Sequence, residues 1–488
     1  MKNSNTFDNL QQIKKRSVSG AFSYFFRTAI LQGIGFVSLA ALSSLFAPED
    51  FGIYGFVVMI IGLLTFFSDI GLAAALVQKK TEPTREEYQT AFTIQQLLGW
   101  AIVVVALGLV YSGIVANKTG WAGNWILLSL AISFPLTTLK TIPSVQLERK
   151  LEFSKLVIPQ IAEQILFHGV LIYLAINRFG VISYAYAILA RTIIGIILMN
   201  YIQHWEFGIR ITRSAVRTLL SYGVKFQLND LLARIKDQLF YIVVGFMLPL
   251  REFGYIQWSK NWSMYPYTLT VQNVMAITFP TFSRLQQRRE ALTKGLELSL
   301  FWITLAIFPL IIGMATFIMP LLTVFSENYG KWMPAALSFS LFSLSIGWSA
   351  ISTPLTNMLN ATGKINQTLK LMLMWTGLTW FLTPPLVLWL GFNGVAVAAI
   401  LISFSSIAAV FMVQKEITIN IWSQLWPQLI AATAMALFAI LGRHIWEQSV
   451  TSLLIGMVLS LGTYMLVLFL LAKEQIIQNT KYLRHLKD

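Results

Sequence analysis

Fourteen long apolar stretches run through this chain of 488 residues, and they constrain its fold more than any other feature. A membrane hydrocarbon core is ~30 Å thick and needs ~20 apolar residues per helix. Hydrophobic residues make up 56% of the chain and charged residues 12%, against ~25% charged in soluble proteins. We therefore predict an all-α polytopic membrane protein with about 14 transmembrane helices, at residues 20–46, 52–78, 90–116, 122–146, 155–177, 180–202, 221–249, 253–282, 293–325, 332–360, 366–390, 393–414, 421–441 and 450–472.

The chain repeats one design after about 200 residues. Gly20 and Gly223 each open a long apolar run, and each run ends in a turn with Pro, an acidic residue and Phe-Gly, at Gly52 and Gly254. Two further pairs keep the same order, Pro143 with Pro354 and Gly180 with Gly394. An even number of helices per copy predicts two parallel six-helix bundles, related by an axis along the membrane normal.

The repeat divides the chain into bundles and flanking segments. We expect a cytoplasmic interfacial segment, a first six-helix bundle, a cytoplasmic linker, a second six-helix bundle, an additional transmembrane helix pair and a basic cytoplasmic tail, at residues 1–19, 20–202, 203–220, 221–414, 421–472 and 473–488.

The distribution of Lys and Arg predicts the orientation. Between the apolar runs, 24 basic residues fall on one side and 5 on the other, which places both termini in the cytoplasm. The formal charge of +15 follows largely from this topology, so we expect no nucleic-acid partner. No cysteine is present, the four His residues lack metal-ligand spacing, and no phosphate-binding or nucleophile motif occurs. The outer loops are short, so we expect neither an enzyme nor a cofactor.

Seven basic residues fall inside the apolar runs, besides Lys155, Lys294 and Lys370, which lie at the cytoplasmic starts of their runs and are counted among the 24. Each costs about 3 kcal/mol at the bilayer centre unless it snorkels, pairs or faces water, so together they indicate a polar interior. Arg27, Arg191 and Arg234 lie deepest and are the main candidates for a cationic substrate cavity between the bundles. Lys140, Lys236 and Lys260 are weaker candidates. Snorkelling is the simpler explanation for Lys140, which lies near a cytoplasmic helix end.

Three aspartates also lie in apolar runs and have two interpretations. Asp69 pairs with Arg27, or it titrates in ion coupling. Asp230 and Asp237 flank Arg234 on one helical face, as a structural triad or as coupling groups.

Lys260 lies in an aromatic segment with Trp258, Trp262 and Tyr265. These rings either stack on sugars or mark the membrane interface.

The segment LFAPEDFGIYGFVVMIIGLLTFFSDIGLAAALVQKK resembles the start of bacterial polysaccharide flippases of the multidrug/oligosaccharidyl-lipid/polysaccharide (MOP) exporter superfamily, of the O-antigen and colanic acid type. The two halves and the terminal helix pair extend the resemblance over nearly the whole chain. It implies a carrier of undecaprenyl-diphosphate-linked oligosaccharide in the bacterial inner membrane, working by alternating access. It also implies Na⁺ or H⁺ coupling and a polysaccharide polymerase with its chain-length machinery as partners.

Three alternatives stay open. A lipid-linked peptidoglycan precursor flippase shares the cationic cavity. A drug exporter would favour intramembrane carboxylates over cations. A membrane polysaccharide polymerase or ligase would normally need a large periplasmic loop.

Overall fold

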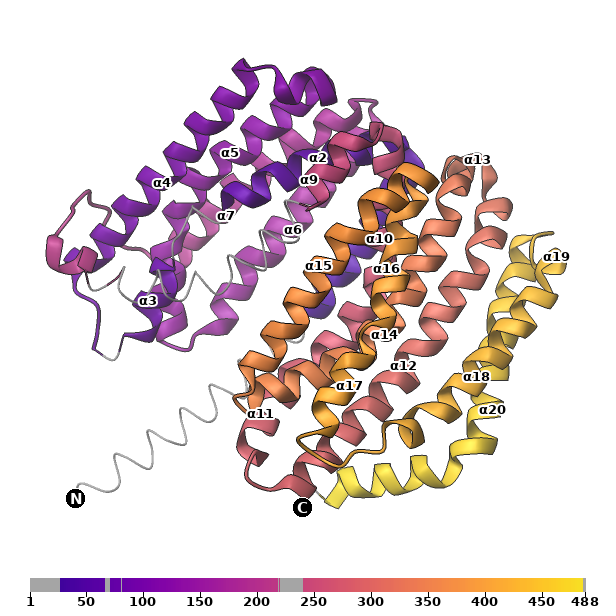
Figure 1. Ribbon diagram of the computed structural model, residues 1–488. Helices are drawn as coiled ribbons and strands as arrows, with labels where there is room; N and C mark the ends of the chain where they lie inside the picture. The colour runs from indigo at the N-terminus through magenta and orange to yellow at the C-terminus, as the bar shows by residue number, and fades with distance from the viewer. Residues whose placement is uncertain (1–26, 66–70, 80, 218, 220–239, 486–488) are drawn as a thin grey trace, which may run out of the picture. The chain divides into compact units, whose positions relative to one another are not determined.

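The computed structural model describes the chain except for residues 1–26, 66–70, 80, 218, 220–239 and 486–488 (Figure 1). The secondary structure of the described residues consists of helices, without a strand. The chain divides into two compact units, Met1–Gly254 and Tyr255–Asp488, with the boundary inside one helix. The predicted all-α membrane architecture is confirmed.

The first unit is built from long helices with short connections. They are the first helix Arg27–Leu45, α2 Pro48–Thr65, α3 Leu72–Gln78, α4 Arg85–Tyr111, α5 Ile114–Arg149, α6 Phe153–Ile176, a 3₁₀ turn Gly180–Ile182, α7 Ser183–Ile202 and α9 Phe240–Met247. The helix α4 packs on α5, and α7 packs on both α5 and α6.

Small residues let the helices of this unit approach closely. A Cβ at Gly99 of α4 would lie 2.9 Å from the backbone nitrogen of Pro135 on α5. The two glycines that mark the repeat also lie against each other, because a Cβ at Gly52 would overlap the carbonyl of Leu250, and one at Gly254 would overlap that of Pro48. In a membrane, such backbone proximity supplies the packing that the hydrophobic effect cannot.

The second unit has a main buried core whose residues come mostly from α12 Arg289–Val324, α14 Ala336–Ala361 and α18 Ile421–Leu441, which are labelled in Figure 1. Its helices are α10 Leu250–Tyr267, which begins in the first unit, a π-helical turn Thr268–Gln272, α11 Asn273–Leu285, α12 Arg289–Val324, α13 Ser326–Tyr329, a 3₁₀ turn Gly330–Ala335, α14 Ala336–Ala361, α15 Ile365–Leu390, α16 Asn393–Phe404, α17 Ile407–Gln414, α18 Ile421–Leu441, α19 Arg443–Trp446 and α20 Val450–His485. The terminal helix α20 packs on α18 and α12, where the buried Tyr464 hydroxyl donates to the Leu305 carbonyl at 3.0 Å.

Twelve helices of the described chain are long and apolar enough to cross a membrane, and each coincides with one of the fourteen predicted runs. Much of the run 221–249 lies outside the described residues. The run 253–282 is helical through α10 and α11, but it falls outside these twelve helices. Large apolar side chains such as Trp389 and Leu441 are about four-fifths exposed, as expected for a protein solvated by lipid.

Candidate functional site

One face of α6 carries side chains that contact polar and charged groups of three neighbouring helices. Gln160, Glu163, Phe167 and His168 are spaced so that they share this face, which we call the α6 polar face. Each contacts another helix. The Arg27 guanidinium of the first helix donates to Gln160 Oε1 at 2.7 Å, and the His168 ring bonds the Ser38 hydroxyl at 2.6 Å.

Lys140 of α5 forms an ion pair with Glu163 of α6. Both side chains are only 18% exposed, so the ammonium does not snorkel to the surface. The snorkelling interpretation of Lys140 is therefore wrong: a partner on the next helix, 23 residues along the chain, satisfies the charge.

Gly195 of α7 makes room for this ion pair. A Cβ at Gly195 would overlap Glu163 Oε1 and would lie 2.5 Å from Glu163 Cδ. The carboxylate thus rests on the bare backbone of α7 while it faces Lys140. Any larger residue at position 195 would have to displace it.

Arg191 of α7 lies over the Phe167 ring, with 5.1 Å between the guanidinium carbon and the ring centroid. A cation over an aromatic face is stabilised by the ring quadrupole, and the ring cancels none of its charge. Arg191 is partly buried, and no ion pair is recorded for it among the described residues. It therefore leaves positive potential beside the α6 polar face.

Three predicted cations of the first unit thus converge on one helix. Arg27, Lys140 and Arg191 come from three different helices and meet α6 at positions 160, 163 and 167. At 1.5 Å per residue these positions span about 10 Å along the helix.

The other predicted residues are not part of this group. Arg234, Lys236, Asp69, Asp230 and Asp237 lie outside the described residues, so the structure does not bear on their pairing. Lys260 lies in α10 on the second unit and is partly buried.

The aromatic segment around Lys260 is in part a packing core. Trp258 is 3% exposed and stacks on Trp332, with ring centroids 4.8 Å apart and planes 8° from parallel. A sugar has no access to such a face, so the sugar-stacking interpretation is wrong for Trp258. Trp262 and Tyr265 are partly buried and tilted relative to each other.

The sequence interpretation missed Glu163 and Gln160. It considered basic residues in apolar runs and gave weight only to Asp among the acids. An acid at position 163 inside the run 155–177 is itself unusual in a membrane helix. Its spacing from Gln160 and Phe167 was the signal that could have identified the polar face.

Residues 41–335 match the sequence profile of a family described as polysaccharide biosynthesis protein. The chain belongs to this polysaccharide biosynthesis protein family. Two curated relatives support the assignment. The succinoglycan biosynthesis transport protein ExoT of Rhizobium meliloti (strain 1021) is 22% identical over 319 residues, which are 64% of this chain and 63% of ExoT. The lipopolysaccharide biosynthesis protein WzxC of Escherichia coli (strain K12) is 21% identical over 367 residues, which are 73% of this chain and 72% of WzxC.

Comparison with solved structures shows that this chain has the fold of known membrane carriers. The lipid II flippase MurJ in an inward closed conformation matches with a TM-score of 0.73 at 15% identity, covering 94% of this chain and 100% of MurJ. An inward-facing multidrug resistance MATE family transporter of the MOP superfamily matches with a TM-score of 0.58 at 14% identity, covering 80% of this chain and 94% of the transporter. ExoT and the two solved structures are named as a transport protein, a flippase and a transporter, and WzxC is named as a lipopolysaccharide biosynthesis protein. The chain shares the multi-pass membrane architecture of the solved structures.

Proposed function

We propose that this chain is a flippase that moves undecaprenyl-diphosphate-linked oligosaccharide repeat units across the bacterial inner membrane for surface polysaccharide biosynthesis. The observation that carries the proposal is the convergence of Arg27, Lys140 and Arg191 on the α6 polar face, within membrane-spanning helices. A diphosphate in the membrane interior needs cations to offset the cost of its desolvation. A guanidinium group can donate two parallel hydrogen bonds to two phosphate oxygens.

In this proposal the chain's cations hold the diphosphate while the sugars cross through water and the prenyl tail stays in lipid. Access alternates between the two leaflets. The same fold in solved MATE transporters is described as inward-facing in one structure and outward-facing in another, which supports this mode of action. Arg234, Lys236 and Lys260 remain proposed members of the binding site.

Both termini are proposed to lie in the cytoplasm. The 24 to 5 asymmetry of Lys and Arg between the apolar runs supports this orientation. The substrate would then be loaded at the membrane face that carries the ends of α5 and α7 and the start of α4.

The test is export of surface polysaccharide by variants produced at equal levels in a strain lacking the protein. We expect R27A and R191A each to abolish export and to leave finished lipid-linked repeat units in the cytoplasmic leaflet. Mass spectrometry of the extracted pool, with accessibility to an external glycan-modifying reagent, measures both. The control K155A removes a cation from the exposed side of α6, where Lys155 is 54% exposed, and should export normally. Normal export by R27A and R191A would refute the proposal.

Ion coupling is proposed to involve Asp69, Asp230 or Asp237. A carboxylate in a membrane helix can bind Na⁺ or a proton during the transport cycle. Transport that continues unchanged after both gradients are collapsed would exclude this part of the proposal.

A second candidate is a lipid-linked peptidoglycan precursor flippase, favoured by the structural match to the lipid II flippase MurJ. The lipid pool separates the two, because that function would accumulate peptidoglycan precursor in the deletion strain. Periplasmic, unpolymerised repeat units would instead indicate a polymerase or ligase.

A further inference from the structure

A cavity of about 820 Å³ lies in the first unit, where α4 begins and where α5 and α7 end. Its walls are the segment 82–88, the end of α5 at 146–150 and the segment 203–206 that follows α7. None of its lining residues belongs to the α6 polar face. The volume falls within the range of small-molecule sites.

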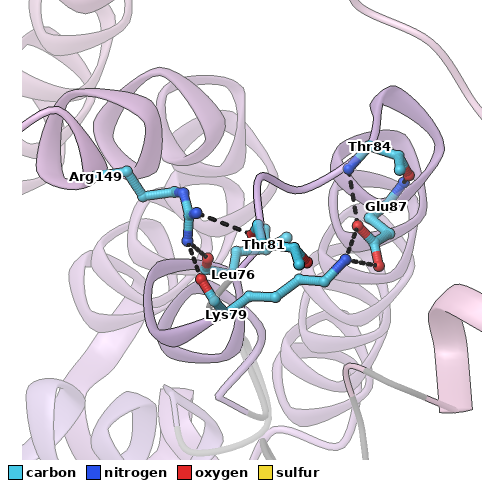
Figure 2. A network of polar contacts seen from close by, with 6 residues as sticks. All are labelled: Leu76, Lys79, Thr81, Thr84, Glu87 and Arg149. Atoms are coloured by element: carbon cyan, nitrogen blue, oxygen red, sulfur yellow. Dashed lines mark hydrogen bonds and ion pairs between the residues drawn. The ribbon is translucent and has the colours of Figure 1, made fainter. Parts of the chain in front are cut away.

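The first wall of this cavity is held rigidly (Figure 2). Arg149 Nη1 donates to the carbonyls of Leu76 at 2.7 Å and Lys79 at 2.9 Å, and Nη2 donates to the Thr81 carbonyl at 3.0 Å. Lys79 Nζ lies 2.6 Å from both carboxylate oxygens of Glu87, which also accepts from the Thr84 backbone at 2.8 Å. These bonds tie Lys79, Thr81 and Thr84, which lie between α3 and α4, to Arg149 of α5 and Glu87 of α4.

The opposite wall contacts its neighbours at three points. Gln203 Nε2 donates to Gln146 Oε1 at 2.9 Å, and Arg85 pairs with Glu206 at 2.5 Å. Trp205 is 5% exposed and packs edge-on against Phe92, with 5.2 Å between centroids. The buried Trp205 and the Gln203–Gln146 bond hold the inner part of this wall, whereas Arg85 and Glu206 lie at its exposed edge. A wall that is held in place loses little conformational entropy when a ligand enters.

The chemistry of the lining differs from that of a phosphate site. Its three cations are offset by two carboxylates, and Arg85 and Arg149 are already bonded within the protein. The remaining groups are two amides, an imidazole, a phenol and an indole. The Trp205 ring is buried against Phe92, so it forms a packed wall and is not open to a ligand. The exposed Glu82, Lys150 and His204, with the two amides, offer mixed donors and acceptors that match the hydroxyl groups of a sugar.

We propose that this cavity binds a saccharide, the sugar portion of the transported lipid-linked oligosaccharide, before translocation. The inference rests on the proposed function and adds a place where the glycan itself is recognised. It makes the rim residues Glu82, Lys150 and His204 determinants of glycan specificity. The α6 polar face, by contrast, would bind the diphosphate, which is common to all such substrates.

The test uses the purified full-length chain in lipid nanodiscs. The probe is the oligosaccharide fraction released by mild acid from lipid-linked oligosaccharides of the host membrane, and saturation-transfer NMR measures its binding. We expect E82A/K150A/H204A to weaken binding at least tenfold, because all three side chains lie on the exposed rim and their loss leaves the core intact. The matched control K473A/E474A/Q478A removes the same charges from exposed positions of α20 and should bind normally.

Binding that is absent from the native chain, or unchanged in the rim variant, would overturn the inference. So would binding of inorganic pyrophosphate that the rim substitutions abolish, since that result would make the cavity an anion site. The export assay with R27A and R191A is independent of these results. If R27A and R191A lose export while the rim variant still binds sugar normally, the saccharide site alone is refuted. If R27A and R191A both export normally, the flippase function itself is refuted.

Discussion

Gly195→Ala should break the Lys140–Glu163 ion pair without touching either charged residue. The added methyl carbon would overlap Glu163 Oε1, the oxygen that pairs with Lys140, so the carboxylate must move out of its place beside the ammonium. If the carboxylate turns freely, the free energy of unfolding falls by the value of one polar interaction between membrane helices, about 0.6–1.7 kcal/mol. If its neighbours resist, overpacking adds about 1–3 kcal/mol. We expect a loss of roughly 2 kcal/mol, which lowers the apparent Tm by about 4–8 °C at the size of this unit.

A double-mutant cycle with Glu163→Ala tests this reasoning. In the E163A background the space beside position 195 is free, so G195A should then change the apparent Tm by less than about 1 °C. The comparison is made in one detergent at one scan rate, because membrane proteins commonly unfold irreversibly. If G195A destabilises the native and E163A chains equally, the methyl group acts on the packing of α6 and α7, and the proposed coupling to the ion pair is wrong.

Three further perturbations follow from contacts of named residues. Gly254→Ala should prevent normal folding, seen as loss of monodisperse protein in size-exclusion chromatography, because the new Cβ would overlap the fixed carbonyl of Pro48. Arg149→Lys should lower the apparent Tm by several degrees, since one ammonium cannot reproduce a guanidinium that bonds carbonyls through two nitrogens, each bond contributing about 1 kcal/mol or more. Hydrogen bonds from Lys364 and Gln367 hold the pKa of Glu416 below its ordinary value of 4.5, so its stabilisation is present above pH 4.5 and is lost as the pH falls through the lowered pKa. The free energy of unfolding of Glu416→Gln should be lower than that of the native chain by at most about 1 kcal/mol at neutral pH, because the pair is solvent-screened. In a pH series, the apparent Tm of the variant should therefore lie slightly below the native value at neutral pH and converge with it in acid.

The membrane spans could be predicted from sequence because hydropathy is a local property. Lipid demands ~20 apolar residues in every helix that crosses it, so the runs identified twelve spans wherever the structure describes them. The run 253–282 shows the limit of this argument. Its helix α10 carries Arg251, Lys260 and many polar aromatic residues. The hydropathy of this helix is therefore too low to identify it as a membrane span.

The partners of the intramembrane charges could not be predicted, because they depend on which faces of different helices meet. Lys140 near the end of its run was expected to snorkel, yet α6 brings Glu163 beside it. Gly195 leaves the space for this contact because it has no side chain. A search of the sequence for charged residues therefore does not find it. Only the packing of α7 against α6 gives that glycine a role.

The pairing also bears on how the α6 polar face could hold an anionic substrate. Lys140 is neutralised by Glu163, so a phosphate must compete with that carboxylate for the ammonium. Arg191 lies on a neutral ring, so it offers its charge without such competition. Arg191 should therefore dominate binding of the diphosphate, and K140A should impair transport less than R191A does. The opposite order in the export assay would mean that Glu163 leaves Lys140 when substrate arrives, and that the ion pair is a moving part of the transport cycle.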